Sequence, residues 1–279
     1  MDSKVIYDVF YLLAAILFIL GVKLMAHPRT ARRGNMFGIL GMTIAIVVSI
    51  LYANEQLESM KIFTLFVIGL CCLLGILFGG ILATRVKMTE MPQLVAVFNG
   101  IGGLASVLVA GAALVVAINF SADEKFASGL SGFIGSITFI GSAVAAGKLQ
   151  ELKFFKKDFP LPTFVRHLIN LALVLSCGWA GYALLDASPD QAVLLYVAIC
   201  SFGFILGYTL TAPIGGADMP VVIALLNSYS GLAASATGFV IGSNILIIAG
   251  SLVGASGIIL TSLMCVAMNR SLLSVLFGG

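Results

Sequence analysis

Long apolar stretches follow one another along almost the whole chain, and polar residues gather in the short segments between them. Each stretch holds about the 20 residues that an α-helix needs to cross the hydrocarbon core of a membrane. The pattern therefore predicts an all-α polytopic membrane protein, with a single transmembrane domain over residues 1–279. The nine predicted spans cover residues 5–22, 36–53, 62–84, 92–118, 126–146, 164–185, 191–210, 220–241 and 245–267.

The basic residues predict how these spans are oriented. Of the 15 lysines and arginines, Lys4, Lys61 and Lys125 lie on the side of the N-terminus, and all the others lie on the opposite side. Basic loops are retained on the cytoplasmic side of a membrane. We therefore expect the N-terminus outside and the C-terminus in the cytoplasm or the mitochondrial matrix.

Composition limits the chemistry that this chain can perform. It is 60% apolar and 10% charged, and the segments between spans are too short for a soluble catalytic domain. The stretch Gly100–Ala105 fits a dinucleotide-binding pattern, but it lies inside an apolar span, so we interpret its glycines as a helix-packing face. Gly250 and Gly254 are expected to pack in the same way. The five cysteines lie in apolar runs and are interpreted as reduced core residues.

One segment of the chain is repeated. Residues 90–105 align with residues 218–233, and seven of these 16 positions are identical. Both segments open even-numbered spans, so the two helices are predicted to cross the membrane in the same direction, as a parallel internal repeat around spans 4 and 8. The identical pairs are Met91/Met219, Pro92/Pro220, Ala96/Ala224, Asn99/Asn227, Gly103/Gly231, Leu104/Leu232 and Ala105/Ala233.

The two copies share an acid before a Met-Pro opening, Glu90 in the first and Asp218 in the second. Proline suits the first helical turn, and an acid before it can cap free N–H groups and complement the helix dipole. Capping alone is one interpretation of both acids. A functional role is more strongly indicated for Asp218 than for Glu90. The loop before Asp218, from Ala212 to Ala217, contains no basic residue that would neutralise this acid.

The paired asparagines lie roughly 10 Å inside their helices, at 1.5 Å per residue. Small and hydroxylated residues continue the same helical faces. One interpretation is that Asn99 and Asn227 hold helices together by hydrogen bonds, which is common in membranes. The other is that they line a narrow hydrated path for protons.

Several motifs resemble the membrane part of the beta subunit of proton-translocating NAD(P) transhydrogenase. They include GGADMPVV from Gly215, LLNSYSG from Leu225, LVGASG from Leu252 and AMNRSLLSV from Ala267, and the resemblance covers essentially the whole chain. FGILGM, MTEMPQLVA and GSAVAAGKL fit the same family.

The resemblance implies a function that composition does not show. The family couples inward proton movement to hydride transfer from NADH to NADP⁺. We therefore expect this chain to conduct protons as part of an enzyme, without a hydride-transfer site or a bound cofactor or metal of its own. NAD(H) and NADP(H) would bind to partner domains, and the NADP(H)-binding domain that usually follows this region is absent from the sequence.

The resemblance also implies partners and a location. We expect the transmembrane helices of an alpha subunit, the two nucleotide-binding domains, a second copy of the complex and the lipid bilayer as partners, and no nucleic acid. The location would be the bacterial inner membrane, or the mitochondrial inner membrane in a eukaryote.

Site residues follow position by position from the resemblance. Asp218 is similar to an acid implicated in proton passage, Asn227 to an asparagine that lines the channel, and Arg270 to an arginine at the junction with the NADP(H) domain. Three further matches are channel-side or helix-contact positions: Ser142, Ser256 and Gly257.

One position departs from part of the family. Some members carry a protonatable histidine where this chain has Asn99. An amide carries no proton at neutral pH, but it can orient a histidine or a water molecule. We therefore expect the alpha subunit's helices to supply the channel histidine.

Two other functions remain open at the level of sequence. A stand-alone secondary transporter for protons or another cation would move its solute without nucleotides or partners. A structural scaffold would need Asp218 and Asn227 for assembly but not for turnover.

Overall fold

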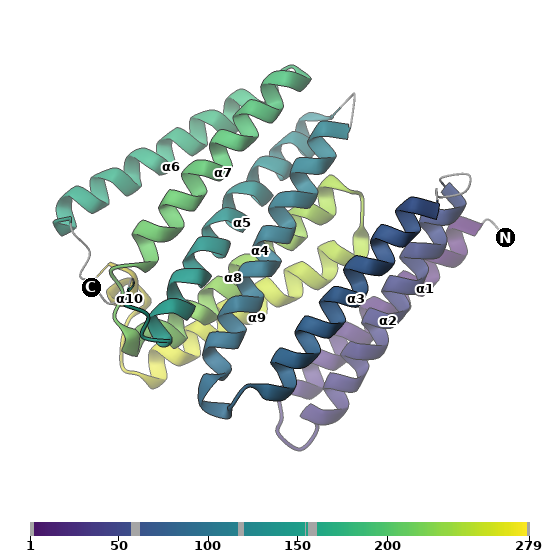
Figure 1. The fold of residues 1–279 in the computed structure, drawn as a ribbon, viewed down its shortest axis with the longest axis horizontal. Coiled ribbons are helices and arrows are strands. Elements are labelled where there is room, and N and C mark those ends of the chain that lie inside the picture. The colour runs from purple at the N-terminus through teal and green to yellow at the C-terminus, as the bar shows by residue number, and fades with distance from the viewer. Residues whose placement is uncertain (1–2, 57–61, 117–119, 154, 156–160, 278–279) are drawn as a thin grey trace. The chain divides into compact units, whose positions relative to one another are not determined.

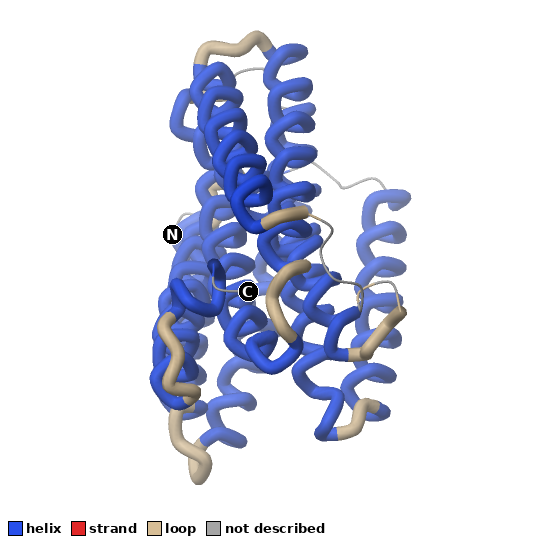
Figure 2. The backbone as a smooth tube through the Cα atoms, turned by 90° about the vertical axis from the view of Figure 1, so that its left-hand side faces the viewer, coloured by secondary structure: helices blue, strands red, loops and turns tan. Residues whose placement is uncertain are grey.

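The chain folds into helices that match the predicted spans. The computed structural model describes residues 3–56, 62–116, 120–153, 155 and 161–277. Within these residues, nine helices are long and apolar enough to cross a membrane, and Figure 2 shows helices, turns and loops but no strand. The nine are α1 (Ser3–Met25), α2 (Ala31–Gln56), α3 (Ile62–Arg85), α4 (Met91–Val116), α5 (Ala122–Leu149), α6 (Thr163–Leu185), α7 (Pro189–Thr211), α8 (Met219–Val240) and α9 (Asn244–Ala267).

The helices form two compact units, Met1–Met88 and Thr89–Gly279. In the first unit, α1 and α2 pack as a hairpin. A Cβ placed on Gly34 would lie 2.6 Å from the carbonyl oxygen of Gly21, so the two backbones meet at glycines. Further along, the Tyr11 hydroxyl hydrogen-bonds Ser49 at 2.9 Å. Helix α3 has no buried residue among those described.

The second unit is built around α5. This helix packs against α4, α6, α7 and α8, and Figure 1 shows it within that group. A Cβ on Gly103 of α4 would lie 2.7 Å from the carbonyl oxygen of Gly135 of α5. Gly103 belongs to the stretch that fits a dinucleotide pattern, so its packing role is confirmed. In a membrane, small residues of this kind let backbones approach closely enough for dispersion contacts.

Two apolar clusters lie at opposite ends of this unit. The first includes Leu184 and Tyr196, and the second includes Met219 and Val222. Between them α5 contributes mainly small and hydroxylated residues to the interior, with Ile137 the large apolar exception. The buried small and hydroxylated residues of that stretch are Ser128, Gly129, Ser131, Gly132, Gly135, Ser136, Thr138, Gly141 and Ser142.

Lysines from the two ends of α5 cap the C-termini of its neighbours. Lys125 Nζ donates to the carbonyl oxygens of Leu185 and Ala187, at 3.1 and 2.7 Å, where α6 ends. Lys148 Nζ donates to the carbonyl oxygens of Ala212 and of Ile214, the latter at 2.7 Å, where α7 ends. The last carbonyls of a helix lack partners within it, and a cation there also complements the helix dipole.

The two repeated segments open with the same local structure. A single 3₁₀ turn precedes each helix, η1 (Met88–Glu90) before α4 and η2 (Gly216–Asp218) before α8. Gly103 and its counterpart Gly231 each face the helix that follows in the chain. A Cβ on Gly231 would lie 2.5 Å from the backbone nitrogen of Gly254 in α9, which confirms the packing role expected for Gly254.

A short helix that the apolar pattern missed follows the ninth span. Helix α10 (Leu272–Phe277) begins where Ser271 Oγ accepts a hydrogen bond from the Ser274 amide at 3.1 Å. Its Val275 is 1% exposed and packs into the cluster that contains Met219. Six residues are too few to give a hydropathy signal.

The glycine contacts give a first testable prediction. Replacing Gly231 with alanine should destabilise the chain by about 1–3 kcal/mol, because the new methyl group would overlap the backbone of α9. Thermal unfolding of the purified chain in detergent, followed by circular dichroism, measures the change.

Gly102→Ala in α4 is the matched control. Nothing lies within 4 Å of a Cβ placed at Gly102, so alanine there should leave stability unchanged or raise it slightly. Equal melting temperatures for the two variants would show that the α8–α9 contact is not tight.

Candidate functional site

Asp218 and Arg270 form an ion pair at one end of the second unit. Arg270 Nη2 lies 3.6 Å from Asp218 Oδ2, and the two side chains are 49% and 14% exposed. The other carboxylate oxygen, Oδ1, is buried and has no hydrogen-bond partner among the described residues. The pair connects the start of α8 to the segment after α9, and at this exposure it adds little to stability.

Asp218 lies directly before α8, where an acid can complement the helix dipole, but the capping hydrogen bond expected of it is absent among the described residues. Its carboxylate makes no capping hydrogen bond, because Asp218 closes the 3₁₀ turn in a helical conformation (φ −91°, ψ −6°) instead of the extended one of a capping residue. The loop before Asp218 contains no basic residue, but a lysine of α5 contacts it. Lys148 Nζ donates to carbonyl oxygens of this loop. The acid therefore faces an arginine distant in sequence.

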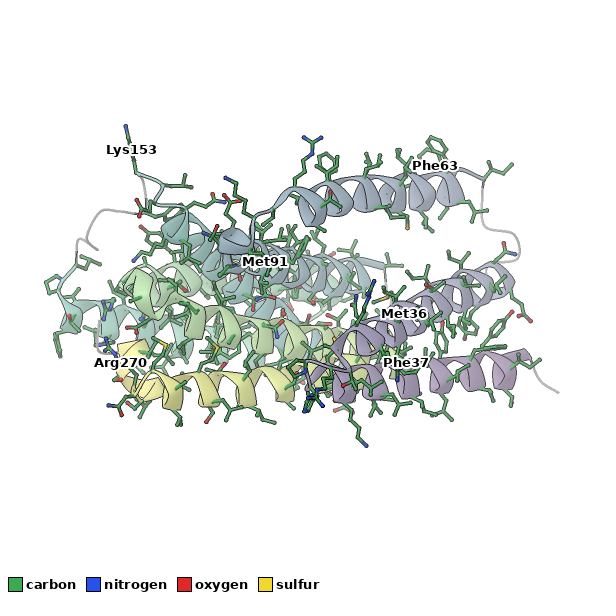
Figure 3. All side chains as sticks on the ribbon, turned by 90° about the horizontal axis from the view of Figure 1, so that it is seen from below. Met36, Phe37, Phe63, Met91, Lys153 and Arg270 are labelled. Carbon is green, nitrogen blue, oxygen red and sulfur yellow. The ribbon has the colours of Figure 1, made fainter. Side chains whose placement is uncertain are left out.

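The turn that ends α9 positions Arg270. Asn269 adopts a left-handed conformation (φ 52°), its amide donates to Val266, and the Arg270 amide donates to Cys265 at 2.9 Å. These two bonds define a Schellman motif, which reverses the chain direction at a helix end. Figure 3 shows Arg270 at the same end of this unit as Lys153, from the loop after α5.

Asn99 joins α4 to α8. It is 7% exposed, and its Nδ2 donates to the carbonyl oxygen of Ile223 at 3.2 Å. In a regular α-helix that carbonyl also accepts the amide four residues on, which is the backbone amide of Asn227. The two matched asparagines therefore meet at one carbonyl, although their side chains differ in role.

Asn227 has no such partner. Its side chain is half-buried and makes no hydrogen bond with any residue that the structure describes, although its backbone carbonyl accepts from Ser230 at 2.8 Å. Its amide is free to bind a water molecule or a partner group. The interpretation as a helix-joining residue thus fits Asn99 and does not fit Asn227.

Ser142 and Gly257 lie opposite equivalent positions of the repeat. A Cβ on Gly100 would lie 3.2 Å from Cβ of Ser142, and a Cβ on Gly257 would lie 2.8 Å from Cβ of Ser228. Gly100 and Ser228 are matched in the repeat. Ser142 is fully buried, and its hydroxyl has no hydrogen-bond partner among the described residues.

Two of the predicted site residues stand apart from these contacts. Glu90 is exposed and forms no hydrogen bond or ion pair with the residues that the structure describes. Ser256 is half-buried, and its hydroxyl donates to Val253 within its own helix at 3.0 Å. The structure gives neither residue a contact that links helices.

Sequence reasoning identified Ser142 but missed the other members of a line of hydroxyl groups on α5. Ser128, Ser131, Thr138 and Ser142 recur at three- to seven-residue intervals on one face, and all four are fully buried. Ser131 Oγ lies 2.7 Å from the Thr237 hydroxyl of α8 and within 3.4 Å of the Ser106 carbonyl of α4. The three- and four-residue spacing was the available signal.

The hydrogen bonds that join α4, α5 and α8 occur in the same order along α4 as along α8. Near their starts Asn99 meets Ile223, and further on Ser131 Oγ reaches both the Ser106 and the Ala233 carbonyl oxygens, at 3.4 and 3.3 Å. Two helices that run in the same direction give this order. The side chains of Asn99 and Ser131, with the carbonyl oxygens that they contact, form a polar seam between α4, α5 and α8. This seam extends from the level of the two asparagines to the middle of the unit.

Comparison with known proteins decides the family. The family model described as NAD(P) transhydrogenase beta subunit matches residues 7–279. The chain belongs to this family. The NAD(P) transhydrogenase subunit beta of Rhodospirillum rubrum is 40% identical over 279 aligned positions, which cover 96% of this chain. A second sequence of that name, from one strain of the same species, matches to the same extent.

The chain spans 57% of the length of the relatives that it matches. Family membership and the nine apolar helices among the described residues make it a multipass membrane protein related to a subunit of an oxidoreductase complex.

The different environments of the two asparagines give a second prediction. Asn99→Leu should lower the stability of the chain by about 1 kcal/mol, because it removes a hydrogen bond between two helices. Asn227→Leu should leave stability unchanged, since no described residue bonds its amide. Detergent unfolding monitored by circular dichroism measures both, and a larger loss for Asn227 would contradict the assignment.

Proposed function

We propose that this chain is the proton-translocating membrane domain of an NAD(P) transhydrogenase. In this role it couples inward proton movement to hydride transfer from NADH to NADP⁺, which separate nucleotide-binding domains carry out. The family match supports the proposal, and a stand-alone cation transporter is not favoured by any contact in the structure.

The observation that carries the coupling role is the Asp218–Arg270 pair. An ionised carboxylate only accepts hydrogen bonds, whereas a protonated one gains a donor and loses its charge. Protonation of Asp218 would therefore release Arg270, which is half exposed and free to contact another domain. The state of one proton thus controls the position of a surface cation.

The proposed proton path reaches Asp218 along the polar seam of α4, α5 and α8. Asn227 lies in α8, nine residues after Asp218 and roughly 13 Å from it along the helix axis. Its unpartnered amide is suited to orient a water molecule or a histidine from another chain, which we assign to the alpha subunit's helices. Ser142 and Ser128 add buried hydroxyls without partners among the described residues.

The proposal includes an orientation. Arg270 and the basic loop after α5 lie on the cytoplasmic or matrix side, and the N-terminus lies outside. On that side the domains that hold NAD(H) and NADP(H) would dock, in an assembly of two complexes in the bacterial or mitochondrial inner membrane. Population shift between two docked states, set by protonation, is the coupling device.

Reconstitution tests the proposal directly. The chain would be assembled with the alpha subunit's helices and both nucleotide domains in liposomes. Proton uptake driven by NADPH and an NAD analogue is then measured for wild type, Asn227→Leu and Asp218→Asn. We expect coupled uptake in wild type and a loss of roughly a hundredfold or more in either variant, comparable to losing a positioned proton-transfer group.

Asn244→Leu is the control, because Asn244 is an exposed asparagine at the start of α9, away from the polar seam. It should retain wild-type uptake. Uptake by assembled Asn227→Leu complexes at the wild-type rate would make Asn227 a structural residue. No uptake in the wild-type complex would overturn the transhydrogenase assignment itself.

A further inference from the structure

Two buried hydroxyl groups form a hydrogen bond between α5 and α8. Ser131 of α5 is fully buried, Thr237 of α8 is 2% exposed, and their side-chain oxygens lie 2.7 Å apart. Thr237 also donates to the carbonyl oxygen of Ala233 in its own helix, at 2.9 Å. A hydroxyl has one proton and two lone pairs. When Thr237 donates to Ala233, Ser131 is therefore the donor of the bond between the two hydroxyls.

The neighbouring carbonyls also allow the opposite direction of this bond. Ser131 Oγ lies 3.3 Å from the carbonyl oxygen of Ala233 and 3.4 Å from that of Ser106 in α4. When Thr237 donates to Ser131, the Ser131 proton therefore still has an acceptor. Neither direction leaves a buried donor unsatisfied, which would cost about 1–3 kcal/mol. The pair can thus reverse its hydrogen bond without losing a partner.

The pair lies between the asparagines and an apolar end of the second unit. Thr237 follows Asn227 by ten residues in α8, roughly 15 Å along the helix axis. Val240 of α8 and Ala127 of α5 lie about one turn beyond the pair, and both belong to the apolar cluster that includes Tyr196. A proton that crosses the unit between α5 and α8 therefore passes the level of this pair.

Unpartnered hydroxyls of α5 lie on both sides of the pair. Ser128 lies about one turn before Ser131, and Ser142 lies about three turns after it on the same face. Both are fully buried, and neither hydroxyl has a hydrogen-bond partner among the described residues. Buried hydroxyls in folded proteins are normally hydrogen-bonded, so each of these two is suited to bind a water molecule. A proton can then approach or leave the pair through water on either side.

Given the proton translocation proposed for this chain, we propose that Ser131 and Thr237 relay the proton between α5 and α8 and exclude metal cations. A proton from a neighbouring water binds a lone pair of one hydroxyl, and that hydroxyl passes its original proton to the other. The second hydroxyl releases its own proton to the next water. One proton enters and one leaves, each hydroxyl forms one O–H bond and breaks one, and both end neutral.

The same geometry excludes ions larger than a proton. A metal cation in a protein needs several oxygen ligands around it, and two oxygens 2.7 Å apart leave no space between them for an ion. The helices are also held together nearby, since a Cβ on Gly135 of α5 would lie 2.6 Å from the Gly103 carbonyl oxygen of α4. A proton requires no such space, because it moves by the exchange of O–H bonds.

Opposite substitutions at one position test the relay in the reconstituted complex. Thr237→Val keeps the shape of the side chain and removes its hydroxyl, so coupled proton uptake should fall by about a hundredfold. Thr237→Ser keeps the hydroxyl and removes a methyl group, so it should retain most of the wild-type rate. A residue that serves only in packing would give the reverse order of the two variants.

Ser131→Ala tests the other half of the pair. It should cause the same loss as Thr237→Val, and the double variant should lose no more than either single variant, because groups that act as a unit are not additive. Thr209→Val is the matched control and should keep wild-type uptake. Thr209 of α7 is 7% exposed, and its hydroxyl donates to the Leu206 carbonyl of its own helix at 3.1 Å, away from the polar seam.

Thermal unfolding in detergent checks that the variants remain folded. Thr237→Val should lose about 1 kcal/mol or less, as is usual for a hydrogen bond between membrane helices. Should Thr237→Val fail to assemble, Ser131→Ala carries the same test. Replacing sodium with choline should leave wild-type uptake unchanged, because the path carries protons only.

Three results would overturn the relay. The first is wild-type uptake by an assembled Thr237→Val or Ser131→Ala complex, and the second is slower uptake by Thr237→Ser than by Thr237→Val. The third is wild-type uptake that requires sodium, which would indicate a cation path. A wild-type complex without any coupled uptake would instead overturn the proposed function, so the two failures are distinguishable.

Discussion

Close backbone approach at small residues is the constraint on which the second unit depends. Lipid tails are as apolar as leucine, so helices in a membrane associate through packing and hydrogen bonds instead of through the hydrophobic effect. Glycines of α4 and α8, at Gly103 and Gly231, allow this approach to the helices that follow them. It brings buried hydroxyls such as that of Ser131 within reach of carbonyl oxygens on two other helices. The polar seam is thus a consequence of the packing.

The ends of the helices require a separate solution, because their last carbonyls have no partners within the helix. Here long cationic side chains reach from α5 to the ends of α6 and α7. Lys125 and Lys148 therefore act as caps, although they lie at opposite ends of α5. A rule that counts basic residues by side of the membrane does not detect this capping role.

Much of the fold could be predicted from sequence, because nine apolar runs of membrane-crossing length give a strong local signal. The packing roles of Gly254 and Gly103 were also predictable, because regularly spaced small residues in an apolar span indicate a helix-packing face. What sequence could not supply is pairing across distance. Asp218 meets Arg270 only because a Schellman turn folds the chain back, and α10 is too short to register as hydropathy.

The repeat shows how one local sequence acquires two roles. Asn99 and Asn227 occupy equivalent positions after equivalent 3₁₀ turns. The side-chain amide of Asn99 donates a hydrogen bond to a carbonyl oxygen of α8, whereas that of Asn227 has no partner among the described residues. A single copy cannot provide both a fixed contact and an available group. The ion pair between the largely buried Asp218 and the half-exposed Arg270 complements this arrangement. An ion pair that contributes little to stability can be broken and remade without unfolding the helices around it, which a coupling element requires.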